Sequence, residues 1–287
     1  MKARVLFGVI GFVAVLLALY VFPAIVLEIA VAVLCLFATY EVIGTTRLVH
    51  NRLELLLCLL VSVGLAVGNF SVLPLDLQDV VQGLIFVLLV GSFAIELKFH
   101  DSMNVSQVSW GFFGALIVPY LMLSLVRIFQ MDFQPVGQTD FHVGQFIVLL
   151  PLLAAWGADT CALFAGMFFG KHRLAPVVSP KKTVEGAVGG VVGGAVLVLL
   201  AALLMNTFLD LDMPIWAALV LGGVGAVLGE IGDLSFSIIK RQTGIKDFGF
   251  LLPGHGGILD RFDSMIFVAP LAESLLLLLP LIVGEAA

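Results

Sequence analysis

The sequence has few charged residues and few cysteines, and each shortage excludes some classes of protein. Only 12% of the 287 residues are charged, whereas 61% are hydrophobic and the mean hydropathy is +1.17. A water-soluble core of this length could not hide so much apolar surface. The three cysteines, Cys35, Cys58 and Cys161, lie in apolar runs without a CxxC spacing or a nearby histidine, which argues against a disulfide framework or a structural zinc site. The composition therefore predicts a membrane protein.

Long apolar runs predict membrane helices and exclude a transmembrane β-barrel. Barrel strands alternate apolar and polar residues, whereas residues 5–21 and 187–204 are apolar throughout. We expect an all-α polytopic membrane bundle of about nine transmembrane helices, with Pro23 separating the first two as a tight hairpin. The predicted spans are 5–21, 23–43, 53–72, 79–97, 108–128, 145–169, 186–207, 214–238 and 262–283.

Basic residues are sorted to alternate loops of this topology. With the N-terminus inside, only Arg127 lies outside, and the outer loops hold acidic residues instead. The positive-inside rule therefore predicts a cytoplasmic N-terminus and an external C-terminus. We expect a bacterial inner membrane, and the net charge of −6 argues against nucleic acid as a partner. The inner basic residues are Lys2, Arg4, Arg47, Arg52, Lys98, Lys171, Arg173, Lys181, Lys182, Lys240, Arg241, Lys246 and Arg261; the outer acidic residues are Asp76, Asp132, Asp140, Asp210 and Asp212.

We expect one continuous bundle of helices whose N-terminal and C-terminal halves have different roles. Residues 1–150 are predicted to be scaffold helices, and residues 151–287 a catalytic region with cytoplasmic loops at 170–186 and 239–261. Carboxylates within apolar spans are costly and are candidate sites by default. The scaffold region has three such carboxylates, none of them in a motif: Glu28, Glu41 and Glu96. Structural hydrogen bonding or a position near the membrane interface is favoured for each, and their roles stay open.

A polar stripe runs along the eighth predicted span. Glu230, Asp233, Ser237 and Lys240 follow one another at spacings of three, four and three, which places them on one helical face. Helix packing with an internal ion pair is the favoured interpretation for Glu230 alone, whereas a functional role is favoured for Asp233. Asp159, near the middle of the sixth span, is expected to line a site or to join a buried hydrogen-bond network.

The loop after that stripe combines glycines, basic residues and carboxylates. Gly256 and Gly257, with Gly254, leave room for a backbone to approach a phosphate. Asp260 and Asp263, three residues apart at a helix start, can face one cavity, and hard carboxylates suit Mg²⁺ when substrate phosphates complete its ligands. Helix capping is the alternative for Asp260.

The other inner loop brings a double lysine to the start of the seventh span. Lys181 and Lys182 at a helix N-terminus predict an anion site, with topological basic charge as the alternative. The span itself begins with Gly186, Gly190 and Gly194 in GxxxG register, which indicates tight helix packing within or between subunits.

Two stretches of the sequence resemble one enzyme family. The run Ser237-x-x-Lys240-Arg241, then Lys246-Asp247, then Pro253-Gly254-His255-Gly256-Gly257-x-x-Asp260-Arg261-x-Asp263 is similar to the signature of the phosphatidate cytidylyltransferases, the integral-membrane CDP-diacylglycerol synthases. Asp159-Thr160 and Ser179-Pro180-Lys181-Lys182-Thr183-x-Glu185-Gly186 resemble a second stretch of that family. The similarity covers about residues 157–186 and 229–264.

The resemblance implies a reaction and a set of roles. CTP and phosphatidate would give CDP-diacylglycerol and pyrophosphate at the cytoplasmic face, with the acyl chains in the bilayer. Mg²⁺, with a second cation allowed, would be held by Asp233, Asp260 and Asp263, which together with Lys240 and Arg241 are the implied catalytic residues. A homodimer is also expected. The implied substrate-binding residues are Asp159, Ser179, Lys181, Lys182, Thr183, Ser237, Lys246, Asp247, His255, Gly256, Gly257 and Arg261.

Two other functions are consistent with the polar residues. A CTP-dependent polyprenol or phytol kinase would also use a nucleotide at the membrane but would transfer the γ-phosphoryl group and release CDP. A transporter could use Asp159, Glu230 and Asp233 as an ion path. An obvious inverted repeat is absent from the sequence, and the carboxylates gather with basic loops at one face, so the transporter is the less favoured alternative.

Overall fold

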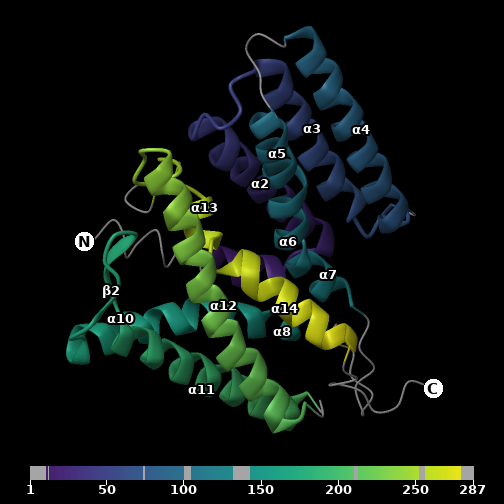
Figure 1. Cartoon of the computed structure of the whole chain (residues 1–287). Helices are drawn as coiled ribbons and strands as arrows, with labels where there is room; N and C mark the ends of the chain where they lie inside the picture. The colour runs from purple at the N-terminus through teal and green to yellow at the C-terminus, as the bar shows by residue number, and fades with distance from the viewer. Residues whose placement is uncertain are drawn as a thin grey trace. The chain divides into compact units, whose positions relative to one another are not determined.

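Helices dominate the computed structural model (Figure 1). It describes residues 11, 13–73, 75–99, 105–131, 143–209, 213–251 and 256–278. Within these residues, six helices are long and apolar enough to cross a membrane, which is consistent with an all-α polytopic membrane protein. These six are Ala24–Thr45, Leu77–Lys98, Val105–Gln130, Gly144–Phe169, Val184–Phe208 and Ile215–Gln242. The predicted number of nine and the orientation of the termini stay predictions.

The chain forms two compact units. Unit 1 comprises Met1–Val126 and Lys240–Phe262, and unit 2 comprises Arg127–Ile239 and Asp263–Ala287. Two helices, α7 (Ser124–Gln130) and α12 (Ile215–Gln242), run from one unit into the other. The functional division at residue 150 is a separate prediction, and it stays one.

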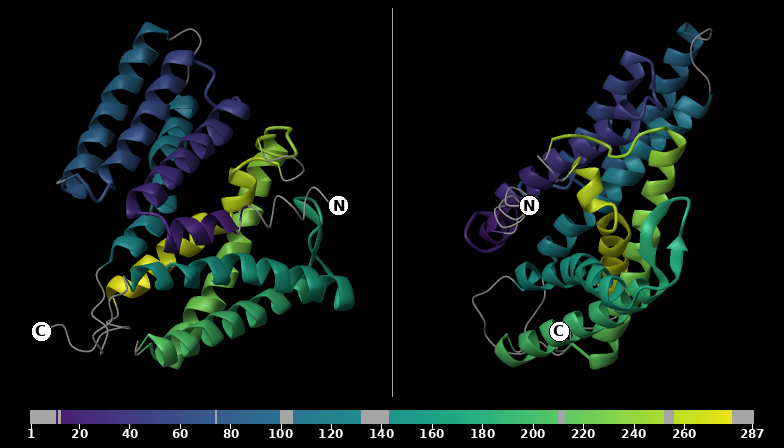
Figure 2. Two further views of the ribbon diagram at one scale, coloured as in Figure 1. Left: turned by 180° about the vertical axis from the view of Figure 1, so that it is seen from behind. Right: turned by 90° about the vertical axis from the view of Figure 1, so that its left-hand side faces the viewer.

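Unit 1 is built from α2 (Ala24–Thr39), α3 (Arg52–Gly68), α4 (Leu77–Lys98) and a fourth stretch of helix. That fourth stretch is α5 (Val105–Phe112), η2 (Phe113–Ile117) and α6 (Val118–Met122); the short α13 (Leu259–Phe262) also belongs to this unit. Both views of Figure 2 show α2, α3 and α4 side by side. The side chains of Asn51 and Asp76 cap α3 and α4 by accepting hydrogen bonds from Leu53 N at 2.9 Å and Gln78 N at 2.7 Å.

Two π-helical segments meet in the interior of unit 1. The segment η1 (Tyr40–Thr45) continues α2, and η2 lies between α5 and α6. A Cβ at Gly114 of η2 would lie 2.5 Å from Ile43 of η1, so the two segments pack too closely for a side chain there. Beside this contact, Thr39 Oγ1 donates to the Gly114 carbonyl oxygen at 2.8 Å. Segments of π-helix are rare and often mark functional positions.

Unit 2 contains a helix pair joined by a hairpin. Its elements are α8 (Gly144–Ile147), α9 (Leu149–Leu152), η3 (Leu153–Gly157), α10 (Ala158–Phe169), β1 (Arg173–Ala175), β2 (Ser179–Thr183), α11 (Val184–Phe208) and α14 (Met265–Leu278), together with most of α12. Helices α10 and α11 lie side by side in Figure 2. A Cβ at Gly190 would lie 3.0 Å from the Cβ of Ala162, and one at Gly194 would lie 3.0 Å from the carbonyl oxygen of Gly222. The GxxxG register is thus used within this chain, for packing on α10 and α12.

The loop at 170–186 contains regular structure that the all-α prediction did not include. Strands β1 and β2 pair antiparallel, with Arg173 opposite Thr183 and an irregularity before Ala175. Thr183 Oγ1 caps α11 by accepting from Gly186 N at 3.1 Å. Glu185 accepts hydrogen bonds from Lys171 N at 3.0 Å and lies 2.6 Å from His172 Nδ1, so the hairpin is tied to the first turn of α11.

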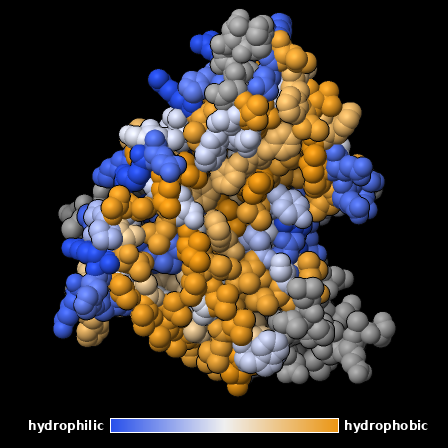
Figure 3. Space-filling view, in the orientation of Figure 1, coloured by the Kyte–Doolittle hydropathy of each residue, from blue (hydrophilic) through white to orange (hydrophobic). Residues whose placement is uncertain are grey.

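Much of the molecular surface is apolar. Of the 22 residues in α4, only Leu88 and Ser92 are buried, and the others are exposed or partly exposed. Figure 3 shows hydrophobic side chains over α4 and α11 on the face that it draws. An exposed apolar area of this extent belongs in lipid rather than in water.

Candidate functional site

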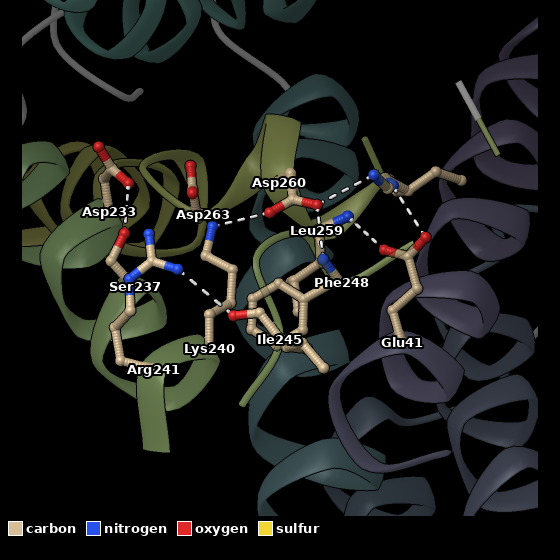
Figure 4. Close-up of polar contacts among 12 residues, drawn as sticks. Glu41, Asp233, Ser237, Lys240, Arg241, Ile245, Phe248, Leu259, Asp260 and Asp263 are labelled. Atoms are coloured by element: carbon tan, nitrogen blue, oxygen red, sulfur yellow. Dashed lines mark hydrogen bonds and ion pairs between the residues drawn. The ribbon is translucent and has the colours of Figure 1, made fainter. Parts of the chain in front are cut away.

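Asp260 is the centre of a polar cluster in unit 1. Its Oδ1 accepts a hydrogen bond from Lys240 Nζ at 2.7 Å, and its Oδ2 accepts from the backbone N–H groups of Phe248 at 2.8 Å and Gly257 at 2.9 Å (Figure 4). The side chain of Asp260 is 4% exposed and that of Lys240 9% exposed. A buried carboxylate is costly unless it is paired and hydrogen-bonded, and Asp260 meets both conditions.

The capping alternative for Asp260 stays open, because acceptance from the amide three residues earlier is also a capping-box contact. Its hydrogen bonds reach back to residues 248 and 257 and not forward along α13, so the carboxylate closes the loop that precedes the helix. Lys240 Nζ also lies 5.2 Å from the centre of the Phe248 ring, within range of a cation–π contact. The predicted site residues Lys240, Gly257 and Asp260 are therefore brought together.

The loop of unit 1 is held from a second side by Glu41 of η1. Its Oε1 accepts from Ile258 N at 3.0 Å and its Oε2 from Leu259 N at 2.7 Å (Figure 4). Glu41 is 3% exposed. These two amides begin α13, where backbone N–H groups have no partner within the helix and a carboxylate is favourable. The scaffold prediction for residues 1–150 had left the role of Glu41 open, and the sequence around it has no motif that could have revealed this contact.

A second polar cluster lies in unit 2. Lys182 Nζ of β2 is 2.8 Å from Glu230 Oε1 and 2.5 Å from Asp233 Oδ2, both on α12. Ser237 Oγ donates to Asp233 Oδ1 at 3.3 Å (Figure 4). Ser264 Oγ donates to Asp159 Oδ2 at 3.3 Å. Lys182 is thus the partner of Glu230 and Asp233, two carboxylates of the predicted stripe, whereas Lys240 of that stripe pairs with Asp260.

The electrostatics of the second cluster favour a charged lysine. Burial by itself would lower the pKa of the Lys182 ammonium, but the adjacent carboxylates of Asp233 and Glu230 outweigh it and raise that pKa above its ordinary value. Lys182 therefore enters this cluster as a cation. In this state it neutralises carboxylates, whereas the sequence had suggested a lysine directed at a substrate phosphate.

The other predicted residues have varied surroundings. Gly256 has a φ of +84°, a backbone conformation that favours glycine. Asp263 is buried and its Oδ1 accepts from Ser264 N at 2.9 Å. His255 lies outside the described residues. The exposed basic residues of the prediction are Lys181, Arg241, Lys246 and Arg261, and the partly exposed polar ones are Ser179, Thr183 and Asp247.

The predicted metal ligands belong to different units. Asp260 is in unit 1, whereas Asp233 and Asp263 are in unit 2. Their joint role as cation ligands therefore stays a prediction. Among the residues that the structure describes, no group of three or more His, Cys, Asp or Glu side chains is arranged to hold a metal ion.

Comparison with known proteins shows the family of this chain. A model described as "Cytidylyltransferase family" matches residues 2–279. The chain belongs to this family. The match extends through the scaffold half, where the sequence by itself had indicated only hydropathy.

Individual relatives carry a more specific name. Proteins named phosphatidate cytidylyltransferase are 46% identical over 134 residues in Staphylococcus saprophyticus, 48% over 130 residues in Staphylococcus epidermidis and 45% over 134 residues in Staphylococcus aureus. The aligned stretch is 47%, 45% and 47% of this chain, and 50%, 48% and 50% of the relative, respectively. The alignments thus span about half the length of these relatives.

Proposed function

We propose that the chain is a phosphatidate cytidylyltransferase. A phosphate oxygen of phosphatidate attacks the α-phosphorus of CTP, the bond from that phosphorus to the bridging oxygen breaks, and pyrophosphate leaves with CDP-diacylglycerol as the lipid product. The observation that carries the proposal is membership of the cytidylyltransferase family over residues 2–279. The names of the relatives, at 45–48% identity, support phosphatidate as the acceptor.

The reaction demands charge neutralisation more than proton transfer. The second pKa of a phosphate monoester is about 6, so the attacking oxygen is already largely ionised at neutral pH. The remaining difficulty is that two polyanions must meet. Arg241 and Lys246 are exposed, the first next to Lys240 in the chain and the second two residues before Phe248, and they would receive phosphate groups. Positioning and electrostatic stabilisation are then the main contributions of this chain.

A divalent cation fits the donor chemistry of the proposed ligands. Asp233, Asp260 and Asp263 offer hard carboxylate oxygens, and Mg²⁺ is usually held by one or two such groups together with substrate phosphates. Asp260 receives three hydrogen bonds, and a carboxylate has about four lone-pair positions, so acceptor capacity remains. When bound, the cation would offset the charge of CTP and make the α-phosphorus more electrophilic. The ligand set rests on the resemblance of the motif.

The proposal includes a place in the cell. The six apolar helices and the bacterial source of the relatives support a bacterial inner membrane. The distribution of basic residues supports a site at the cytoplasmic face, where CTP is present. A homodimer stays a prediction from the resemblance.

Product analysis tests the proposed function. The purified full-length protein, in lipid nanodiscs with phosphatidate, is incubated with CTP and Mg²⁺, and the lipids are analysed by mass spectrometry while pyrophosphate and CDP are measured. We expect CDP-diacylglycerol and pyrophosphate in equal amounts. A phosphorylated lipid with CDP would instead indicate the kinase, and turnover that does not depend on phosphatidate would refute the proposal.

A further inference from the structure

We propose that Glu41 is a positioning residue for the reaction, one that fixes the signature loop before α13 from the N-terminal half of the chain. The inference rests on the proposed function for its catalytic consequence, whereas the contact itself can be tested without any reaction. Glu41 touches neither of the substrates in this account. Its action passes through the backbone of Ile258 and Leu259 to Asp260, the next residue.

The contact has the features of a specific anchor. Each carboxylate oxygen of Glu41 accepts one backbone N–H, from residues that are 217 and 218 positions away in the sequence. The carboxylate is buried, so its loss would leave two amides without their acceptor in a place that water does not reach. Glu41 is also the second residue of the π-helical segment η1, and such segments are frequent at functional sites.

Two glycines of the loop are explained by Glu41. A Cβ at Gly257 would lie 2.5 Å from both carboxylate oxygens, and a Cβ at Gly249 would contact Oε1 even more closely. The φ of Gly257 is not among the positive values found in the described residues, so its backbone does not itself require glycine. The carboxylate of Glu41 requires it, because the loop backbone must approach that group within hydrogen-bond distance.

Two carboxylates therefore share one loop. Glu41 holds the amides of residues 258 and 259, and Asp260 holds those of residues 248 and 257. Asp260 in turn fixes Lys240 Nζ at 2.7 Å. Figure 4 shows the carboxylates of Glu41 and Asp260 bound to different amides of this loop. Removing the Glu41 carboxylate would therefore free the amides of residues 258 and 259 while leaving those held by Asp260. Because reacting groups must be held to within a fraction of an ångström, this release is expected to lower turnover.

Glu41→Gln tests the anchor, with Glu54→Gln as the matched control. Glu54 is also a buried glutamate of unit 1, but its carboxylate accepts from Ser92 Oγ of α4, at 2.6 Å. A glutamine at position 41 can accept one amide and opposes the other with its own NH₂ group. We expect hydrogen exchange at Ile258 and Leu259 to quicken by about tenfold. Turnover should fall by roughly 10–100-fold with little change in KM for CTP, and the control should change neither measurement.

A double-mutant cycle tests the same contact should Glu41→Gln fold poorly. Gly257→Ala is expected to lower the midpoint of thermal unfolding in the wild-type protein, because its methyl group meets the Glu41 carboxylate. In a Glu41→Ala background the carboxylate is absent, so Gly257→Ala should lower the midpoint of thermal unfolding much less. Gly83→Ala in α4 is the control, since a Cβ at Gly83 has nothing within 4 Å.

The outcomes separate this proposal from the proposed function. Faster exchange confined to residues 257–259, together with non-additivity in the cycle, supports the anchor. Normal turnover in Glu41→Gln, or equal costs of Gly257→Ala in both backgrounds, would overturn it. A wild-type protein that forms no CDP-diacylglycerol would overturn the catalytic role together with the proposed function, while exchange at Ile258 and Leu259 would still decide whether the anchor exists.

Discussion

The two lysine–carboxylate clusters are alike in chemistry but differ in construction. In unit 1, Lys240 meets Asp260 where both side chains are less than 10% exposed, and backbone amides supply the remaining hydrogen bonds. In unit 2, Lys182 bridges Glu230 and Asp233 where the three side chains are 18–26% exposed. Burial and backbone contacts make the first cluster a fixed part of a loop. The second is a more open ion-pair network at the end of a hairpin.

The largest effect should come from the carboxylate at the centre of the buried cluster. Asp260→Asn removes the charge that balances Lys240, and breaking a buried pair from one side costs about 3–5 kcal/mol. We expect pyrophosphate release to fall below detection and the unfolding midpoint to drop. Asp233→Asn should also stop turnover but should lower the midpoint less, because its surroundings are more exposed. If both variants lowered the unfolding midpoint equally, the two clusters would not differ in burial as the structure indicates.

A substitution in the backbone of the buried cluster should have the next largest effect. Gly256 has a φ of +84°, and a Cβ there would lie 2.9 Å from Asp260 Oδ2. For Gly256→Ala we expect a loss of about 1–2 kcal/mol in the free energy of unfolding, and reduced turnover. The measurement is denaturant unfolding in detergent. Wild-type stability of Gly256→Ala would show that the loop has room for a methyl group beside Asp260, against the contact distance given above.

Neighbouring lysines of the hairpin sharpen the comparison further. Lys182→Met leaves Glu230 and Asp233 adjacent without a cation, whereas Lys181→Met alters an exposed residue. We expect turnover to fall at least tenfold more in the former than in the latter, in line with a 1.4 kcal/mol difference. Initial rates at saturating CTP provide the measurement. Equal losses would indicate that the double lysine acts only as diffuse basic charge.

The same ion pairs predict a direction for the dependence on pH. Because the folded pKa of Lys182 is raised above the ordinary 10.5, its contribution to stability is fully present below that value. It is lost as pH rises through the raised pKa. Thermal unfolding of wild type and Lys182→Met between neutral and strongly alkaline pH should therefore converge at the alkaline end. A difference that grows with pH would contradict this sign.

The smallest effect is expected from an ion pair that belongs to neither cluster. Arg127 Nε and Nη2 donate to the two carboxylate oxygens of Glu273 at 2.5 and 2.8 Å, a partly buried bidentate pair within unit 2. Arg127→Gln should reduce the free energy of unfolding by about 1 kcal/mol and leave kcat unchanged. A loss of turnover without loss of stability would show that residues outside the two clusters enter the reaction.

The sequence allowed the local parts of this architecture to be predicted. Hydropathy located the apolar helices because membrane insertion depends on composition more than on packing. Helical spacing placed Glu230, Asp233 and Ser237 on one face, and the compact signature brought Lys240 near Asp260. The hairpin was not predicted, because Pro180 within β2 argues against a strand, although a proline is tolerated in a two-stranded ribbon.

Contacts between distant segments could not be predicted in the same way. Nothing around Glu41 distinguishes it from Glu28 or Glu96, and its partners lie more than 200 positions further along the chain. Its role depends on η1 aiming the carboxylate at a loop whose glycines admit it. The partner of Lys182 was likewise hidden, since a basic residue near a helix N-terminus suggests an anion before it suggests a carboxylate of the same chain.

The fate of the CTP phosphates tests the central claim most directly. The protein in phosphatidate-containing nanodiscs is supplied with CTP that carries radioactive phosphorus at either the α or the γ position, and the lipid fraction is separated. The cytidylyltransferase account predicts that the lipid acquires label from the α position only and that Asp260→Asn abolishes the transfer. Label entering the lipid from the γ position, or from neither position, would contradict it.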